Sequence, residues 1–446
     1  MRMFLAAMFA VLWLVADGRS VAADRPNVLF LLTDDQRADT IGALGNPAIR
    51  TPHMDGLVQR GFAFRNAYCL GSNMPAVCTP SRNMLFSGRA YFRWDGPQAP
   101  ADASNFPASM NAAGYETWHY GKRGNTAVKI QELFEHNRYL EDDEAARTSG
   151  EPGAEIVDAA IEFLSARKPD RPFFMCLAFA APHDPRVAAE AYRDEYDPAE
   201  IPLPRNFLPL HPFNNGEQLV RDELLAPFPR TAENIRAQLH DYYATITGLD
   251  HHIGRLLKSL DDRGLADETL IVFTSDHGLS LGSHGLMGKQ NLYEHSLRVP
   301  LVFAGPGIPQ GESAALASLM DIFPTVCELT GATAGDGLDG RSLAAVLRGD
   351  ADAVRESLFF AYRDVQRGIR TDRWKMIFYP RINRVQVFDL AADPDELKDL
   401  STDFSTYMAQ EELIQKLRAL QAELGDEASL ASVTPEDAAF TPPATE

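Results

Sequence analysis

The sequence has few cysteines, no excess of positive charge and no long apolar run beyond its first residues. Four cysteines among 446 residues are too few for a disulfide framework, and their spacing fits no zinc site. The formal net charge of −20 argues against a nucleic-acid partner, because nucleic acids select basic surfaces. No segment after the N-terminus is apolar over enough residues to span a membrane.

The remaining composition is that of an ordinary globular protein. Apolar residues make up 45% and charged residues 23% of the chain, which is enough apolar material for a sizeable core. The length allows two or three domains, or one large α/β domain with an addition. Because the protein is acidic overall, an anionic substrate would have to be bound by a local cluster of positive side chains.

The N-terminus has the pattern of a targeting segment. Arg2 precedes an apolar run over residues 4–15, and small residues at 21–23 offer a cleavage site before Asp24. The sequence therefore predicts a signal peptide over residues 1–23 and a mature protein that is periplasmic or secreted and does not span a membrane. An uncleaved anchor is the alternative.

Acidic residues follow two short apolar runs, each typical of a strand buried on both faces. The runs are residues 26–33 and 269–274. Asp34 and Asp35 follow the first, and Asp276 and His277 follow the second. Ligands bind at the carboxyl ends of strands in open α/β sheets. Calcium accepts oxygen ligands in loose geometry, so these residues suggest a metal site; a solvated turn and a zinc site are the alternatives.

A third apolar run, residues 173–179, leads into a histidine between two prolines. His183 is held there in a fixed loop, either as a functional group or as a turn histidine in water. Residues 186–230 are rich in proline and lack periodicity, and we expect this long loop to cover the pocket and choose the substrate. A long helix follows from residue 231 and ends at Gly264.

The stretch from residue 69 to residue 89 has the strongest motif. It contains Cys78-Thr-Pro80-Ser-Arg82 followed by an apolar run. Pro80 fits the first turn of a helix, which puts Cys78 at the helix N-terminus, where an anion is favoured. Arg82 lies one turn on and points back toward it. A buried core cysteine or a Cys69–Cys78 disulfide is the alternative.

This motif resembles the signature of the sulfatase family, in which the cysteine is oxidised to formylglycine. The usual signature ends in Thr-Gly-Arg, where this chain has Ser87-Gly88-Arg89. The resemblance covers about residues 25–425 and includes a Gly-Lys pair at Lys122 and a second one at Lys289. Ser283 stands where the family usually has glutamate.

The resemblance implies most of the site residues. The catalytic residues would be Cys78, Arg82, Lys122, His183 and Lys289, and one calcium ion would be bound by Asp34, Asp35, the oxidised Cys78, Asp276 and His277. Lys122, Lys289 and His183 would bind sulfate, and Arg82 would hold the hydrated aldehyde. A formylglycine-generating enzyme is the implied maturation partner.

One family residue is missing. Sulfatases carry a histidine two or three residues after the first lysine, and it helps break down the sulfated intermediate. This chain has Gly124 and Asn125 there. His119 lies on the other side of Lys122, so it is a weak replacement.

The expected fold is α/β and alkaline-phosphatase-like, with a large mixed sheet between helices and a small antiparallel sheet near the C-terminus. The expected divisions are a catalytic domain over 24–350, the small-sheet subdomain over 351–425 and a mobile tail over 426–446. The expected activity is hydrolysis of a sulfated carbohydrate or another sulfate ester. The alternatives are a phosphodiesterase or phosphonate monoester hydrolase of the same superfamily and a non-catalytic binding relative.

Overall fold

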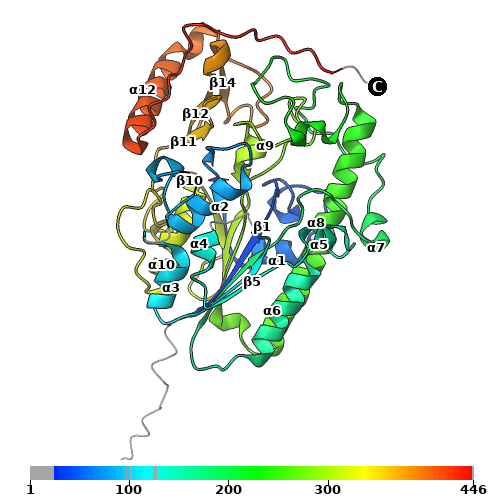
Figure 1. Cartoon of the computed structure of the whole chain (residues 1–446), viewed down its shortest axis with the longest axis vertical. Coiled ribbons are helices and arrows are strands. Elements are labelled where there is room, and N and C mark those ends of the chain that lie inside the picture. The colour runs from blue at the N-terminus through cyan, green and yellow to red at the C-terminus, as the bar shows by residue number, and fades with distance from the viewer. Residues whose placement is uncertain (1–24, 97, 101–102, 124–127, 444–446) are drawn as a thin grey trace, which may run out of the picture.

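Two sheets organise the structure. The computed structural model describes residues 25–443 except 97, 101–102 and 124–127. A nine-stranded mixed sheet has the order β10-β2-β9-β7-β1-β6-β4-β5, with β8 also paired to β2. A second sheet of five strands lies beyond one end of it (Figure 1). The predicted α/β architecture is confirmed.

The large sheet is parallel where it carries the site residues. Strands β7, β1, β6 and β4 are adjacent and parallel, whereas β9 runs antiparallel to β7 and β2. The strands of this sheet are β1 (Asn27–Thr33), β2 (Phe62–Tyr68), β4 (Glu116–Gly121), β5 (His136–Tyr139), β6 (Phe173–Ala178), β7 (Thr269–Ser275), β8 (Arg298–Val299), β9 (Leu301–Ala304) and β10 (Gly311–Ser318).

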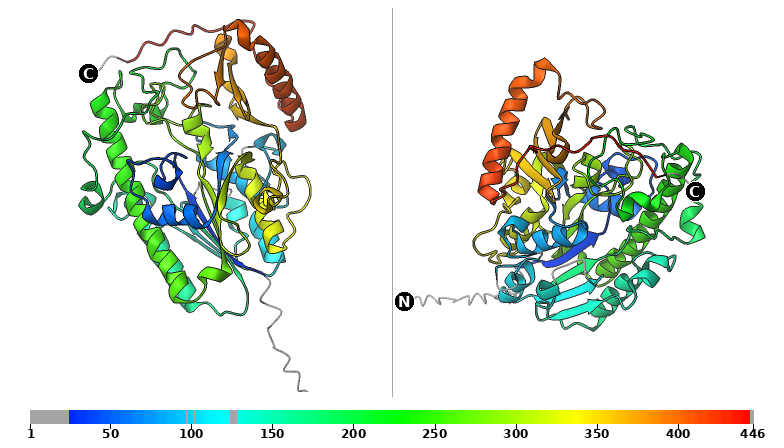
Figure 2. Two further views of the ribbon diagram at one scale, coloured as in Figure 1. Left: turned by 180° about the vertical axis from the view of Figure 1, so that it is seen from behind. Right: turned by 45° about the horizontal axis from the view of Figure 1, so that its top comes forward.

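Helices cover both faces of the large sheet (Figures 1 and 2). On one face lie α1 (Pro52–Arg60), α6 (Ala154–Ala166) and α8 (Ala232–Asp262), and on the other lie α2 (Cys78–Ser87), α3 (Phe106–Ala112) and α10 (Ile322–Thr330). The shorter helices are α4 (Val128–Gln131), α5 (Asp143–Thr148), α7 (Glu190–Arg193), α9 (Glu294–Leu297) and α11 (Ala344–Arg348).

The alternation of side chains along β1 explains the two-sided core. Phe30 packs into the core on the side of α2 and α3, while Leu29 and Leu31 pack into the core on the side of α6 and α8. All three are fully or almost fully buried. A strand buried on both faces reads as a continuous apolar run, which is why the sequence identified β1, β6 and β7.

The small sheet is not built from C-terminal residues alone. Its antiparallel strands are β11 (Ser357–Tyr362), β12 (Gln366–Thr371), β13 (Trp374–Tyr379) and β14 (Arg384–Asp389), and α12 (Tyr407–Leu424) packs on it. The short strand β3 (Gly71–Ser72) pairs with β11 in parallel. The segment just before Cys78 therefore joins the two sheets.

The chain beyond α12 crosses back over the top of the molecule (Figure 1). The Asp426 carboxylate accepts hydrogen bonds from Arg367, and the Ala438 carbonyl accepts one from the amide of Asn214 at 2.8 Å. The Phe440 ring lies 5.5 Å from that of Phe228. These contacts reach the long loop before α8.

No helix between residues 25 and 443, as far as the structure describes them, is long and apolar enough to cross a membrane. The predicted signal peptide lies outside the described residues.

Candidate active site

The carboxyl ends of the parallel strands bring the predicted residues together. Asp34 and Asp35 follow β1, Asp276 and His277 follow β7, and His183 lies in the loop after β6. Asp35 has a left-handed backbone, with φ of 71°. This conformation is uncommon for a residue other than glycine, and it lets both successive carboxylates take part in the same cluster.

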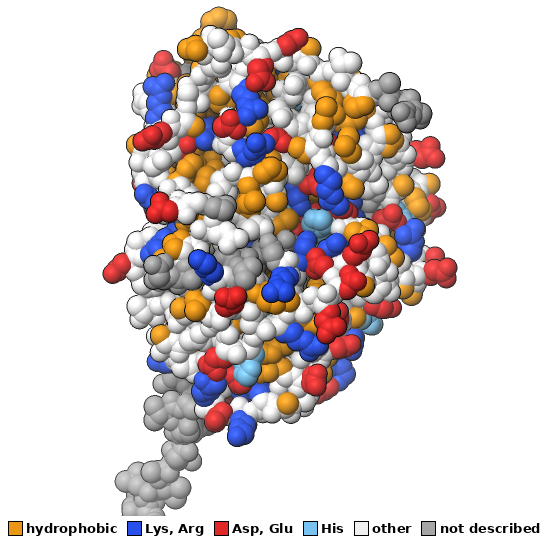
Figure 3. Space-filling model, in the orientation of Figure 1, with side chains coloured by type: hydrophobic (Ala, Val, Ile, Leu, Met, Phe, Trp, Pro, Cys, Tyr) orange, Lys and Arg blue, Asp and Glu red, His pale blue; other side chains and the backbone are white. Residues whose placement is uncertain are grey.

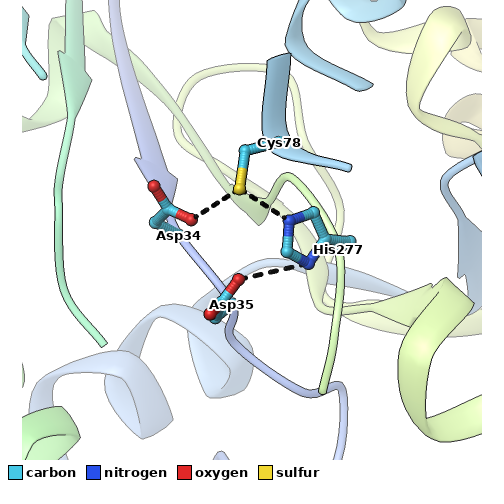
Figure 4. A group of neighbouring side chains, drawn as sticks. All are labelled: Asp34, Asp35, Cys78 and His277. Atoms are coloured by element: carbon cyan, nitrogen blue, oxygen red, sulfur yellow. Dashed lines mark hydrogen bonds and ion pairs between the residues drawn. The ribbon is translucent and has the colours of Figure 1, made fainter. Parts of the chain in front are cut away.

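Cys78 opens helix α2 in the middle of this group (Figure 4). Its Sγ lies 3.3 Å from an Asp34 oxygen, 3.1 Å from His277 Nε2 and 3.3 Å from Lys289 Nζ. The predicted helix start and the placement of Cys78 at the helix N-terminus are confirmed. All four cysteines are free, so the Cys69–Cys78 disulfide does not form.

Cys78 is not a good nucleophile as a thiol. Burial, reinforced by the nearby Asp34 carboxylate, raises the pKa of the thiol well above its ordinary value, although Lys289 acts in the other direction. The thiolate is the nucleophilic form of cysteine, and here it is strongly disfavoured. As a thiol, Cys78 is therefore held in its protonated form.

Arg82 lies one helical turn behind Cys78 and binds the surrounding carboxylates. Its Nε is 2.8 Å from Asp276 Oδ2, and its Nη2 is 3.3 Å from Asp34 Oδ2. All three side chains are fully buried. Arg82 Nη1 has no hydrogen-bond partner among the described residues, so one donor remains available within the site.

Lys289 is the second buried cation. Its Nζ is 2.7 Å from Asp35 Oδ1. Burial opposes ionisation of Asp35, but Lys289 and the other neighbouring cations lower the pKa of this carboxyl to about 2. Burial likewise opposes ionisation of Asp34, and Lys122 and Arg82 hold its pKa well below the ordinary value. Both carboxylates are therefore ionised over the physiological pH range.

Lys122 and His183 lie where the site opens to solvent. The Lys122 side chain is 14% exposed, and its Nζ is 3.8 Å from Asp34 Oδ2. His183 is 13% exposed, and its Nδ1 is 2.6 Å from the Asp184 carbonyl oxygen. The structure thus brings Lys122, His183 and Lys289 around the same pair of aspartates.

A metal ion could be held by the residues nearest to Cys78. Asp34, Asp35, Cys78 and His277 each offer a ligand atom, and these atoms lie within 4.8 Å of one another. Asp276 lies at the edge of this group, because its carboxylate bonds to Arg82 and accepts the Asp35 amide at 3.2 Å. Its predicted role as a ligand stays a prediction.

Further charged residues surround the site, and the sequence analysis did not identify them. Asp222 Oδ2 is 3.9 Å from Lys289 Nζ, and Arg221 bonds to both Asp222 and Asp184. On the other side, Asp143 lies 3.7 Å from Lys122. Arg221 and Asp222 belong to the loop expected to choose the substrate. Their only signal in the sequence is a charged Arg-Asp-Glu triplet within a proline-rich stretch.

His119 does not replace the missing family histidine. It lies on β4 and is fully buried, and its ring nitrogens contact Asn137 at 3.0 Å and Gln131 at 3.0 Å. Burial lowers the pKa of His119 to about 4. It is a core histidine whose two ring nitrogens are occupied by Asn137 and Gln131. Gly124 and Asn125, where the family carries its histidine, lie outside the described residues.

Family models match most of this chain. The model described as Sulfatase matches residues 26–332, and the one described as N-sulphoglucosamine sulphohydrolase, C-terminal, matches residues 282–423. The chain belongs to the sulfatase family. It is therefore a sulfatase, and the resemblance drawn from the Cys78 motif is confirmed at the level of the family.

Individual relatives agree with this family. The chain is 29% identical over 447 residues to an ulvan-active sulfatase of Formosa agariphila, covering 90% of this chain and 82% of that protein. A solved structure in complex with its substrate D-glucosamine-2-N,6-O-disulfate has a TM-score of 0.75 at 24% identity, covering 90% of this chain and 99% of that one. A phosphonate monoester hydrolase of Agrobacterium radiobacter has the same TM-score at 23% identity, covering 90% of this chain and 96% of that one. At this identity the last two share the fold.

Proposed function

We propose that this sulfatase removes sulfate from a sulfated carbohydrate, with Cys78 oxidised to formylglycine and one calcium ion in the site. The observation that carries the proposal is the position of Cys78 Sγ, within 3.3 Å of Asp34, His277 and Lys289. The thiol itself is held protonated there. An aldehyde on the same carbon, once hydrated, supplies a hydroxyl nucleophile in its place.

The donor set around Cys78 fits calcium after this oxidation. Before oxidation, the candidate ligands are two carboxylates, an imidazole and a sulfur atom, which are all ligand types that zinc accepts. Oxidation replaces the sulfur by oxygen and makes the set mostly oxygen, which calcium prefers. Asp34, Asp35 and His277 would hold the ion together with the matured residue 78 and Asp276. When bound, the ion supplies positive charge that stabilises the nucleophile and the sulfate oxygens.

The chain's own cations explain how sulfate would be bound. Lys289 and Lys122 would neutralise the sulfate oxygens, on which charge accumulates during the transfer. His183 lies at the open side, where it can protonate the leaving oxygen. Arg82, with its free Nη1 donor and its bonds to Asp276 and Asp34, would fix the hydrated aldehyde.

The substrate proposal rests on what the similar proteins act on. The relative from Formosa agariphila is named as ulvan-active, and the solved neighbour was captured with a sulfated glucosamine. Both are sulfated carbohydrates. We extend this class to the present chain. We also propose export by the N-terminal segment to the periplasm or the exterior, and maturation of Cys78 by a formylglycine-generating enzyme.

Parallel rate measurements test the proposal. The matured protein should release sulfate from aryl sulfates and from a panel of sulfated sugars, with many turnovers per molecule. It should hydrolyse aryl phosphodiesters and phosphonate monoesters with a lower kcat/KM. A higher kcat/KM on the phosphorus substrates would favour the phosphonate hydrolase alternative, and the absence of multiple turnover on every ester would favour a non-catalytic relative.

A further inference from the structure

A chain of ion pairs connects two of the sulfate-binding residues across the opening of the site. His183 is followed in sequence by Asp184, whose carboxylate binds Arg221 through both terminal nitrogens. Arg221 Nη1 also lies 2.9 Å from Asp222 Oδ1, and Asp222 Oδ2 lies 3.9 Å from Lys289 Nζ. Because Arg221 is exposed beside His183 and Lys289, a substrate group next to the sulfate can reach it.

The exposure of these residues shows which groups are free to bind. The Arg221 side chain is 61% exposed, whereas those of Asp184 and Asp222 are 9% exposed. Each carboxylate oxygen has two lone pairs, so both aspartates can accept a further hydrogen bond. Arg221 has five N–H donors, and the ion pairs occupy part of them. The set offers donors and acceptors side by side.

This set is held rigidly by the residues next to it. Glu223 accepts the amides of Met287 and Gly288 at 2.9 and 2.8 Å, immediately before Lys289. Its carboxylate also binds the fully buried Arg230 at 2.8 Å. Gln290 donates to Asp222 at 2.8 Å. The loop is thus fixed to the segment that carries Lys289, and its side chains are oriented before substrate binds.

The charges at the opening balance one another. Arg221 is paired with Asp184 and Asp222, and Arg147 and Lys122 both lie near Asp143, at 2.8 and 3.7 Å. Basic and acidic side chains are also interspersed around the centre of the face in Figure 3. A second acidic group on the substrate would have to displace one of these carboxylates, whereas neutral hydroxyls can bond to both members of a pair.

We propose that Asp184, Arg221 and Asp222 form a subsite that binds the hydroxyl groups of a neutral sugar ring carrying the sulfate. This proposal rests on the proposed function and narrows its substrate to sugars without a second acidic group on that ring. It thereby distinguishes this chain from the 24% identical neighbour, whose substrate carries two sulfates on one glucosamine. Because buried polar groups left unpaired are costly, a site built for a hydroxyl strongly rejects analogues that lack it.

A cycle of residue and substrate changes tests the subsite. The best monosulfated neutral sugar from the panel is compared with its deoxy analogues, and both with an aryl sulfate, in the wild type and in Arg221→Gln and Asp184→Asn. In the wild type, removing the recognised hydroxyl should lower kcat/KM about 10–100-fold. In either variant the same removal should cost less than about 3-fold, because the partner is already lost.

The matched control is Arg373→Gln. Arg373 binds Asp389 through two nitrogens in the small sheet, with 55% and 11% of the side chains exposed, which reproduces the Arg221–Asp184 pair away from the site. It should leave the cost of removing the hydroxyl as in the wild type. Thermal unfolding curves establish that each variant is folded. Because Arg221→Gln and Asp184→Asn change different residues, the test can still be made if one of them fails to fold.

Three results would overturn the subsite. The first is an equal cost of hydroxyl removal in the wild type and both variants. The second is a wild-type preference for a sugar with a uronate or second sulfate that disappears in Arg221→Gln, which would make Arg221 an anion site. The third is a wild type that turns over no sulfate ester, including the aryl sulfate; this alone marks failure of the proposed function.

Discussion

Two buried polar clusters lie close to one another and differ in kind. The catalytic cluster consists of Asp34, Asp35, Cys78, His277 and Lys289. The seam cluster, which joins the large sheet to the small one, consists of His284, Glu294, His295, Lys375 and Glu396. Each has a buried lysine paired with a buried carboxylate and at least one buried histidine. Buried charge alone therefore does not identify the active site.

The two clusters differ in the state of their carboxylates. In the catalytic cluster, cations hold the pKa of Asp34 well below its ordinary value and lower that of Asp35 to about 2. In the seam cluster, burial raises the pKa of Glu396 to about 7 even though Lys375 lies 2.8 Å away. Burial also opposes ionisation of Glu294, but Lys375 and Arg370 lower the pKa of that carboxyl to about 2, so Glu396 is the carboxyl that sets the seam cluster apart. The catalytic cluster keeps both negative charges and meets solvent through Lys122 and His183, whereas Glu294, His295 and Glu396 of the seam cluster line a separate pocket. The first is suited to hold a cation and a substrate, and the second to hold two sheets together.

Removal of the metal should distinguish the two clusters most strongly, because only the catalytic cluster is proposed to bind the ion. Treating the matured protein with a chelator should lower kcat/KM by more than about 10³-fold, because the ion contributes several kcal/mol to the transition state. Calcium at about 100 times its Kd should raise the free energy of unfolding by about 2.7 kcal/mol. Activity and thermal unfolding with added calcium or zinc measure both effects.

Matched variants assign the metal to one cluster. Asp35→Asn should remove the stabilisation by calcium, and Glu396→Gln should retain it. Loss of the calcium effect in Glu396→Gln alone would place the ion in the seam cluster and contradict the comparison.

Replacing each buried lysine by methionine should affect a different property, activity for Lys289 and stability for Lys375. Lys289→Met removes a cation that is proposed to bind sulfate, and kcat/KM should fall about 10²–10³-fold. Lys375→Met leaves Glu294 and Glu396 without their shared cation, and the free energy of unfolding should fall by about 3–5 kcal/mol. Steady-state kinetics and denaturant unfolding of both variants give the two numbers.

Lys398→Met, at an exposed lysine of the same subdomain, is the control and should change neither quantity. Lys375→Met should keep kcat/KM per folded molecule within about 3-fold of the wild type. A loss of activity in Lys375→Met as large as that in Lys289→Met would mean that the clusters act as one.

Much of the catalytic cluster could be predicted from the sequence, because its residues follow strands that read as continuous apolar runs. Asp34, Asp276 and His183 each come just after such a run, and parallel strands bring their carboxyl ends to one edge. The start of α2 at Cys78 followed from Pro80 and the apolar residues after it.

The seam cluster and the outer residues could not be predicted in the same way. Residues 281–294 resemble one family motif, yet its members lie in different clusters. Lys289 belongs to the catalytic cluster, whereas His284 and Glu294, with the adjacent His295, belong to the seam cluster. Lys375 and Glu396 join the seam from strands and turns far along the chain. Arg221 and Asp222 lie in a short 3-10 helix (Arg221–Leu225) within a stretch whose sequence has no periodicity, so only tertiary contacts fix the positions of their side chains.

The pH dependence of stability should show the smallest difference between the two clusters. The folded pKa of Glu396 is raised to about 7 from 4.5, so its contribution is fully present below about pH 4.5 and is lost as pH rises through 7. Between pH 5 and 8 the free energy of unfolding should fall by about 1–3 kcal/mol from this group. Denaturant unfolding across this range measures the fall.

The contribution of Asp35 to the free energy of unfolding should change with pH in the opposite direction and in a lower pH range. Its pKa is lowered to about 2 from 3.8, so its contribution is present above about pH 3.8 and is lost only as pH falls through 2. Glu396→Gln should therefore flatten the curve between pH 5 and 8. An unchanged slope in that variant would show that Glu396 ionises normally in the folded protein.

The central claim, that oxidised Cys78 is the nucleophile, is tested most directly by relating conversion to activity. Preparations made with different amounts of a formylglycine-generating enzyme are digested, and mass spectrometry gives the fraction of Cys78 converted to aldehyde. Sulfate release per molecule should rise in proportion to that fraction and extrapolate to zero at no conversion, and Cys78→Ala should show no turnover. Full activity in a preparation whose Cys78 is entirely thiol would contradict the account.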